Sequence, residues 1–454
     1  MASNLTSGNI NKQIFSMFVP MLISVAVQQL YGITDMVIVG KFVSADAFAA
    51  VNCTSSFNSM VLSFILGFVN GCGILVSNAF GANKPRTMKR VIANGIYLVG
   101  FMAIVVTGMF LIFLNPVLHL LNTPSDVYSM AYSYIFIIIL SYPFSIGSNY
   151  LGSLFNAIGD TKTIVLRGAI STVINIVLDL LFVVVFRWGV VGAAAATLLA
   201  SLIYFVISVL MYLFIFRELH IKKKHMKPDF SIIKESFMLG FPLGITSCTT
   251  MLGCTLIQSC VNGLGTVYLT AFSAAGKVEY LLTVPIISYT SALRIFLSQN
   301  HGAKKVDRIF KAIKNSVLIA TVYGLILSPV LRFFGDEMCL MYLNASETQA
   351  FELIRYYTSF TGTLFVLLCL LYIVRSTIQG LGYGKFIAIG GFIELATRVF
   401  VAFVLVDKFK FFAISISCPL SWILTVAFLS AALIFAVIPK LRKLRSEEIE
   451  CQIQ

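Results

Sequence analysis

Long apolar stretches alternate with short polar segments along the whole chain. Each stretch has about the 20 residues that a helix needs to cross roughly 30 Å of hydrocarbon. The runs are continuous, which favours helices over the alternating strands of a membrane barrel. Twelve runs are present, near residues 13–39, 55–80, 91–115, 130–150, 164–186, 189–215, 236–262, 268–298, 312–333, 351–374, 386–406 and 411–437. The pattern predicts an all-α polytopic membrane protein with twelve transmembrane helices.

The chain also repeats itself, weakly but in order, at an offset of about 222 residues. The matching segments are Pro20 with Pro242, residues 77–82 with 298–303, residues 121–123 with 343–345, and residues 156–159 with 379–382. Matches in the same order at a nearly constant offset indicate two homologous halves, each with six spans. In membrane proteins such halves are typical of transporters that move one half against the other around a site near the midplane.

One sizeable polar segment interrupts this pattern, and it lies at the centre of the chain. Residues 217–235 are basic and contain Pro228. We interpret them as a cytoplasmic linker between an N-terminal six-helix lobe, residues 1–216, and a C-terminal six-helix lobe, residues 236–440. Residues 441–454 are expected to form a cytoplasmic tail.

The charge of the chain follows its topology. Hydrophobic residues make up 58% of the sequence and charged residues 11%, and the formal net charge is +14. The basic residues are concentrated in alternate loops, at 84–90, 222–227, 304–311 and 440–445. This is the positive-inside pattern, with both termini in the cytoplasm. It accounts for the basic charge through topology and contact with anionic lipids rather than nucleic acid.

Ionisable groups within apolar spans are costly and are therefore functional candidates. The ionisable candidates in the first half are Asp35 and Asp179, and the polar residues Asn175, four residues before Asp179, and Thr197, in the sixth span, join them as candidates. At about 1.5 Å per residue, Asp35 lies roughly 8 Å, and Asp179 and Thr197 roughly 12 Å, inside the outer boundary. Carboxylates, an amide oxygen and a hydroxyl form an all-oxygen set, which suits Na+ or, where two carboxylates meet, a proton.

The repeat sharpens this hypothesis, because the acidic set has no counterpart in the second half. The positions equivalent to Asp35 and Asp179 are not acidic, and Asn175 corresponds to about Arg398. Features that both halves share, such as the prolines and the basic loops, are expected to serve the fold. The acidic set occurs in one half only and is therefore the better candidate for a functional site.

The second half has charged residues of its own inside spans. Glu394 precedes Arg398 by four residues, which allows an ion pair on one helix face, and Glu279 lies in the eighth span. Arg294 and Arg375 lie near expected cytoplasmic helix ends, where long basic side chains snorkel. We assign Glu279 and Glu394 to a substrate cavity.

Two further residues share a helix face with Asp35. Tyr31 precedes it by four residues and Gln28 by seven. Both are candidates for the lining of a cavity next to the acidic site.

Motifs of enzymes are missing. The chain has no H-E-x-x-H, G-x-S-x-G or Walker A sequence. We therefore expect no enzymatic activity and no cofactor or metal beyond Na+ at the coupling site, with energy drawn from an ion gradient.

Several segments of the sequence resemble those of the MATE (multidrug and toxic compound extrusion) family. The segments that carry the resemblance are residues 29–35 (QLYGITD), 81–83 (GAN), 159–162 (GDTK), 175–179 (NIVLD) and 189–194 (GVVGAA). The resemblance covers nearly the whole chain. It implies that Asp35, Asn175, Asp179 and Thr197 form a cation site in the first lobe, with Tyr31 beside it. Some members carry a cation-binding glutamate in the seventh span, where this chain has Thr249 and Thr250, so Glu279 or Glu394 would have to replace it.

The resemblance implies a monomeric secondary antiporter of the plasma (inner) membrane. It would export organic, often cationic, drugs or metabolites in exchange for H+ or Na+, by alternating access of two lobes. A lipid or oligosaccharide flippase of the same superfamily is the alternative, and dependence on a lipid-linked substrate would favour it. An intramembrane enzyme and a passive channel are two further alternatives. The enzyme would turn over its substrate without an ion gradient, and the channel would show no saturable, gradient-dependent uptake.

Overall fold

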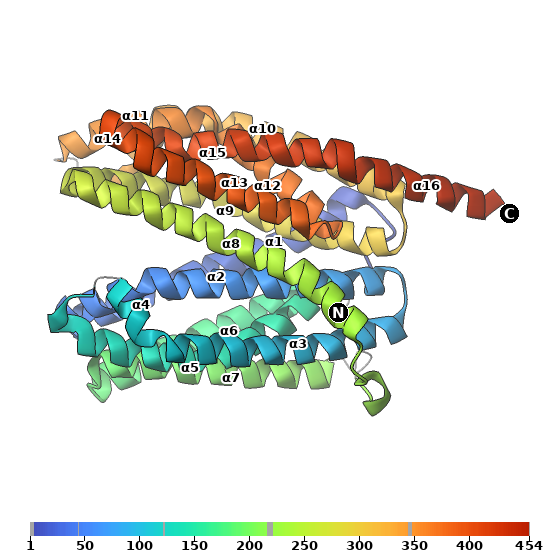
Figure 1. The fold of residues 1–454 in the computed structure, drawn as a ribbon, viewed down its shortest axis with the longest axis horizontal. Helices are drawn as coiled ribbons and strands as arrows, with labels where there is room; N and C mark the ends of the chain where they lie inside the picture. The colour runs from blue at the N-terminus through green and yellow to red at the C-terminus, as the bar shows by residue number, and fades with distance from the viewer. Residues whose placement is uncertain (1–3, 44, 121–122, 216–220, 344–346, 454) are drawn as a thin grey trace. The chain divides into compact units, whose positions relative to one another are not determined.

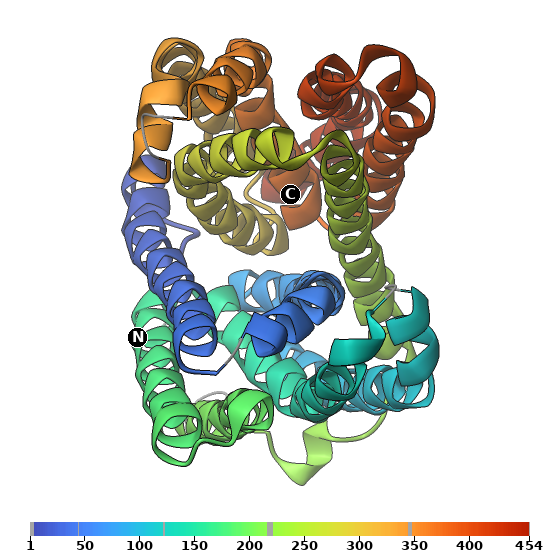
Figure 2. The ribbon, with the colours of Figure 1, turned by 90° about the vertical axis from the view of Figure 1, so that its left-hand side faces the viewer.

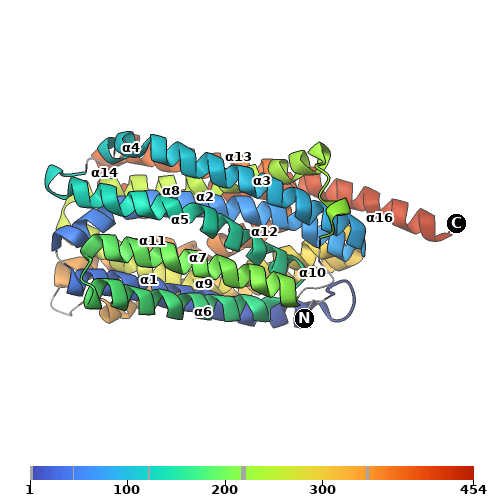
Figure 3. The same cartoon turned by 90° about the horizontal axis from the view of Figure 1, so that it is seen from below.

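The computed structural model of the chain is helical, and no strand occurs in the residues that it describes. These are residues 4–43, 45–120, 123–215, 221–343 and 347–453. Within these ranges, the side chains of residues 30–37, 39–41, 45–46, 48–49, 52–53, 120, 215 and 448–453 are outside the described set. Figures 1 to 3 show the helices along and across their length.

Among the described residues, the first half of the chain contains seven α-helices and one π-helical segment. They are α1 (Ile10–Phe42), α2 (Ala45–Gly81), α3 (Pro85–Ile112), α4 (Leu114–Leu120), α5 (Ser125–Ala157), α6 (Thr161–Asp179), the π-helix η1 (Leu180–Val185) and α7 (Gly189–Ile215). A short 3-10 turn, η3 (Lys223–His225), lies in the linker.

The second half has a similar order. Its elements are α8 (Phe230–Leu264), α9 (Thr266–Gly302), α10 (Val306–Met338), η4 (Cys339–Met341), α11 (Thr348–Thr363), α12 (Phe365–Gly380), α13 (Gly384–Phe400), the π-helix η5 (Val401–Leu405), α14 (Val406–Phe409), α15 (Phe411–Ala432), the π-helix η6 (Leu433–Val437) and α16 (Ile438–Ile453).

Among the described residues, eleven helices are long and apolar enough to cross a membrane. A twelfth span results if α11 and α12, which meet at a bend of 48°, are counted as one. The expected all-α polytopic fold is therefore confirmed. Several helices begin a few residues before the apolar runs that predicted them, because their first turns carry polar residues that suit the membrane surface.

The internal repeat is visible in the backbone. Residues with positive φ recur at equivalent turns, as Asn83 with Lys304, Gly159 with Gly382, and Arg187 with Lys410. The π-helices η1 and η5 also occupy equivalent places, directly after α6 and α13. Equivalent turns with the same unusual backbone support the interpretation of two related halves.

Contacts divide the chain into two compact units whose boundaries differ from the expected lobes. One unit is built on Val19–Gly244, and the other joins Leu5–Phe18 to Ile245–Gln454. Helices α1 and α8 therefore each begin in one unit and end in the other. Both change unit within three residues of a proline, Pro20 or Pro242, and proline removes a helical hydrogen bond at that place.

Close backbone packing explains why the start of α8 belongs to the first unit. A Cβ on Gly71 of α2 would lie 2.5 Å from the Cα of Gly240 of α8. A Cβ on Gly240 would in turn lie 2.7 Å from the carbonyl oxygen of Phe68. Only glycine permits this approach. Helices α5 and α7 also pack side by side in this unit, as Figure 3 shows.

Polar contacts bind the N-terminal segment, residues 5–13, to the second unit. Arg308 of α10 donates hydrogen bonds to the carbonyl oxygens of Leu5 (3.1 Å) and Gly8 (2.7 Å). It also donates to Oε1 of Gln13 (2.9 Å) and Oδ1 of Asn300 (3.0 Å). One guanidinium thus ties residues 5–13 to α9 and α10.

The linker is attached to the first unit in a related way. Asp229 accepts from Arg90 at 2.6 Å, and its backbone N–H donates to Oδ1 of Asn94 at 2.7 Å. His225 is buried, and its Nδ1 accepts from the backbone N–H of Lys222 at 3.1 Å. Desolvation lowers the pKa of His225 below its ordinary value of 6.5, and Lys224, Lys89, Lys222 and Arg86 add to this effect.

The first prediction concerns Arg308. Arg308→Ala should lower the free energy of unfolding by roughly 1–2 kcal/mol, because several hydrogen bonds to one charged group are lost. It should also expose residues 5–13 to proteolysis. Thermal unfolding and limited proteolysis of the purified protein would measure both. Lys314→Ala, at an exposed position of the same helix, serves as the control. Wild-type protease resistance in Arg308→Ala would contradict the assignment.

The second prediction concerns the linker and pH. The native linker favours neutral His225, so the unfolded linker takes up a proton first as the pH falls. The contribution of neutral His225 to the stability of the linker should be full above pH 6.5 and should decrease below that value. Hydrogen–deuterium exchange of residues 221–229, corrected for the intrinsic rate, should be faster at pH 5.5 than at pH 7.5. His225→Gln should remove this difference, and a difference that persists would refute the role of His225.

Candidate functional site

Two polar residues of α6 lie deep inside the first unit. Asn175 and Asp179 are one helical turn apart, and they are only 2% and 1% exposed. Neither the Nδ2 nor the Oδ1 atom of Asn175 has a hydrogen-bond partner among the described residues. Because a buried amide without partners is costly, this position is a candidate for ligand binding.

The local backbone explains how α6 presents this pair. The side chain of Asp160 caps the start of the helix by accepting from the backbone N–H of Thr163 at 3.2 Å. The helix then continues as α until Asp179 and changes to π geometry from Leu180 onward. π-Helical turns are frequent at functional sites, since they change the direction of the side chains around them.

The three helices that were expected to share the site meet in a small apolar cluster. It contains Ile38 of α1, Val183 of η1 and Ala193 of α7, all buried. Ile38 follows Asp35 by three residues, and Val183 and Ala193 are each four residues from Asp179 and Thr197. The cluster therefore brings the expected segments of all three helices to one level of the unit.

Thr197 is only half-buried, and its hydroxyl donates to the carbonyl oxygen of Ala193 at 3.1 Å. The lone pairs of that hydroxyl stay available to accept or to bind a cation. The side chain of Gln28 is exposed. The side chains of Tyr31 and Asp35 lie outside the described residues, so their expected roles stay predictions.

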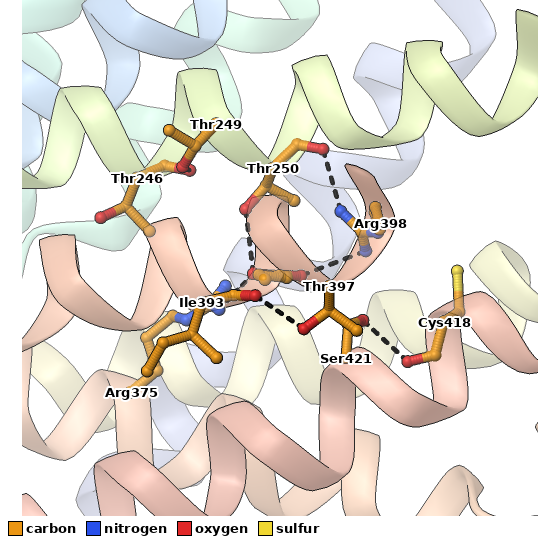
Figure 4. A network of polar contacts seen from close by, with 10 residues as sticks. Thr246, Thr249, Thr250, Arg375, Ile393, Thr397, Arg398, Cys418 and Ser421 are labelled. Carbon is orange, nitrogen blue, oxygen red and sulfur yellow. Dashed lines mark hydrogen bonds and ion pairs between the residues drawn. The ribbon is translucent and has the colours of Figure 1, made fainter. Parts of the chain in front are cut away.

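Glu394, Arg375 and Arg398 of the second unit form a polar network with Thr250, and Figure 4 labels Arg375, Arg398 and Thr250. The carboxylate of Glu394 lies 2.7 Å from Nη2 of Arg375 and 3.2 Å from Nη2 of Arg398. It also accepts from the hydroxyl of Thr250 at 3.1 Å. Arg398 donates in addition to the carbonyl oxygen of Thr250. The ion pair expected between Glu394 and Arg398 is therefore present.

Arg375 corrects a sequence-based expectation. It was expected to snorkel at a helix end, but its side chain is only 15% exposed and pairs with Glu394. The reason is that α12 packs against α13, which carries Glu394 to within reach. The contact between Thr250 and Glu394 was not predicted either. From the sequence, Thr250 was notable only because it stands where some family members carry a glutamate. Arg294 reaches Oε1 of Gln379 at 3.4 Å.

Glu279 of α9 is the remaining carboxylate of interest. It is half-buried and accepts from the hydroxyl of Tyr357 at 3.3 Å. Within the described part of the chain it forms no ion pair, and Lys277 lies instead over the ring of Tyr342. Glu279 is thus much less constrained than Glu394. Its place in a substrate cavity stays a prediction.

The two units therefore differ in chemistry. The first has a buried carboxylate and a buried amide on one helix face. The second has a carboxylate already bound by two guanidinium groups. No group of three or more His, Cys, Asp or Glu side chains suited to a metal occurs among the residues that the structure describes.

Known proteins resemble this chain throughout its length. The model of the MatE family matches twice, at residues 20–181 and 242–404. The two matches have the offset of the internal repeat and end close to Asp179 and Arg398. The probable multidrug resistance protein YpnP of Bacillus subtilis is 28% identical over 384 residues, which cover 81% of this chain and 83% of that protein. The probable multidrug resistance protein YoeA of the same organism is 25% identical over 340 residues, 73% of each chain.

Solved structures agree on the fold. A MATE crystal structure in the bent conformation superposes with a TM-score of 0.86 at 19% identity, and the match covers 98% of both chains. Because the family model matches most of the sequence in both halves, this chain belongs to the MatE family of transporters.

Proposed function

We propose that the protein is a secondary antiporter that exports organic, often cationic, compounds in exchange for inward H+ or Na+. Membership of the family and the names of its relatives, multidrug resistance proteins, support this proposal. It would act as a monomer in the plasma (inner) membrane, with both termini in the cytoplasm, and would need no cofactor. The positive-inside distribution of charge supports this orientation.

The buried pair of α6 is the observation that carries the proposal. Asp179 is 1% exposed inside a membrane span, where an ionised carboxylate is costly unless a proton or a cation neutralises it. Asn175, one turn away, offers an amide oxygen without a partner among the described residues. Binding of H+ or Na+ here would remove a large electrostatic penalty, and that free energy is available to bias one conformation.

The second unit is the weaker candidate for coupling. Protonation of Glu394 would leave the guanidinium groups of Arg375 and Arg398 buried without their counter-charge. Glu394 should therefore stay ionised throughout the cycle and hold α8, α12 and α13 together. Glu279 lies outside that network, so a change in its protonation would not break it.

The path of the chain suggests how binding would be transmitted. Helix α1 carries Asp35 in the first unit, while its first turns belong to the second unit. A change at the coupling site would thus act on a helix that continues through Pro20 into the other unit. Helix α8 provides the same connection in reverse, through Pro242. Ion and substrate would be coupled if each of them binds the two conformational states of the protein with different affinity.

Asp179→Asn tests the coupling site. The variant should fold but should lower ethidium export from cells to the level of cells without the protein, because asparagine cannot take up a proton or neutralise Na+. Asp160→Asn is a matched control, since Asp160 is also a buried acid of the first unit. Asparagine is a good N-cap, so the control should keep both the fold and export. Normal export by Asp179→Asn would refute the site, and Asp35→Asn should behave as Asp179→Asn does.

Glu394→Gln tests the structural role of the second network. Two buried guanidinium groups would lose their counter-charge, so the free energy of unfolding should fall by about 3–5 kcal/mol. Glu352→Gln, at an exposed glutamate of α11, should change it by less than about 0.5 kcal/mol. Thermal unfolding in detergent would compare the two variants. Equal stability of both would contradict the proposed role of Glu394.

A further inference from the structure

An open cleft of about 560 Å³ lies in the second unit, where α10 begins and α16 follows η6. Five of its six lining residues are charged or polar. The residues are Asp307, Phe310, Lys311, Arg442, Arg445 and Ser446. None of them belongs to the candidate coupling site or to the Glu394 network.

The cleft carries an excess of positive charge. Lys311, Arg442 and Arg445 contribute three cations, and Asp307 contributes the one carboxylate of the lining. Asp307 pairs with Arg445 at 2.9 Å, and both side chains are at least half exposed. Lys311 and Arg442 are exposed, and no ion pair includes either of them within the described residues. Two cations of the cleft are thus free to bind an anionic group.

Along α10, the basic end of the helix leads directly into an apolar surface. Leu318, Val322 and Leu325 follow Lys311 at seven, eleven and fourteen residues, which keeps them on the same helix face. All three are exposed, Leu318 by 64%. This face is polar for its first turns and suited to hydrocarbon thereafter.

The second wall of the cleft, formed by α16, likewise adjoins an exposed apolar surface, which belongs to η6. Helix α15, η6 and α16 form one continuous helix, in which Phe435 is 80% exposed and Ile434 is 54% exposed. Arg442 follows Phe435 by seven residues. Figure 1 shows α16 continuing from α15 toward the C-terminus. The basic residues of both walls therefore lie where exposed apolar surface ends.

We infer that this cleft binds the headgroup of an anionic phospholipid of the cytoplasmic leaflet. The phosphate would lie between Lys311 and Arg442, since arginine and lysine are the side chains that bind phosphate. The acyl chains would lie along the exposed apolar faces of α10 and of η6. Phe310, half-exposed in the lining, would contact the glycerol region.

The apolar surface decides between a lipid and a soluble anion. A free phosphate would need only the cations, and nothing in its chemistry would use the exposed Leu318 or Phe435 beside them. A phospholipid uses both, and basic pockets beside spans on the cytoplasmic side are the usual place for anionic headgroups. The inference does not rest on the proposed transport function, because lipid binding is measured without transport.

The test uses full-length protein purified in detergent and stripped of lipid. Native mass spectrometry would compare retention of phosphatidylglycerol with that of phosphatidylcholine carrying the same acyl chains. The variant Lys311→Gln/Arg442→Gln removes the two free cations. The control Lys443→Gln/Lys223→Gln removes the same charge from exposed residues outside the cleft, one of them adjacent to Arg442.

We expect the wild-type protein to retain phosphatidylglycerol in preference to phosphatidylcholine. The cleft variant should bind phosphatidylglycerol roughly 30-fold more weakly, at about 1 kcal/mol for each basic residue, and the control should bind as the wild type does. Equal retention of both lipids by the wild type would overturn the inference, as would wild-type retention by the cleft variant. Complete displacement by inorganic phosphate would overturn the choice of a lipid.

If Lys311→Gln/Arg442→Gln does not fold, a comparison of the single variants Arg442→Gln and Lys443→Gln tests whether the cleft binds the lipid. These are neighbouring residues of one helix, and only Arg442 lines the cleft. Phosphatidylglycerol should then raise the unfolding temperature of Lys443→Gln more than that of Arg442→Gln. Equal increases would refute the site.

Discussion

The cost of a charge in a low-dielectric interior governs the arrangement of both units. A carboxylate buried in a membrane span needs a proton, a cation or a basic partner. The first unit buries Asp179 beside an amide whose atoms have no partner among the described residues, whereas the second surrounds Glu394 with two guanidinium groups. In the second half this constraint is met by an ion-pair network that belongs to the chain itself.

The equivalent positions make this contrast informative. Helices α6 and α13 match in the repeat, and each carries a buried polar pair shortly before a π-helical segment, Asn175 with Asp179 and Glu394 with Arg398. The backbone of the two halves has been kept, while the side chains differ. In the first half the pair lacks a basic residue, and in the second half Arg398 stands near the position of Asn175.

The fold could largely be predicted from the sequence, because each span is long, apolar and continuous. The repeat also followed from matching turns, whose positive-φ residues recur in the structure. The division into units could not be predicted in the same way. Nothing in the apolar pattern of α1 indicates that Leu5–Phe18 packs with the second half, since that depends on contacts of Arg308 with residues about 300 positions away.

The candidate site was predictable in part for a related reason. Asn175 and Asp179 stand out because they are polar residues on one face of an apolar helix, and their burial agrees with that interpretation. Arg375 did not stand out, because an arginine near a helix end normally reaches the surface. Only the packing of α12 against α13 turns it toward Glu394. The apolar cluster of Ile38, Val183 and Ala193 was likewise hidden, as apolar residues are common on every face of these helices.

The central claim is that an ion gradient drives export through the first unit. Purified protein in proteoliposomes, loaded with ethidium and exposed separately to an imposed pH gradient and an imposed Na+ gradient, tests it most directly. The account predicts dye movement under one gradient and an immediate stop when an ionophore collapses that gradient. Equal dye movement with and without a gradient would contradict it, and no movement under either would favour a lipid-linked substrate instead.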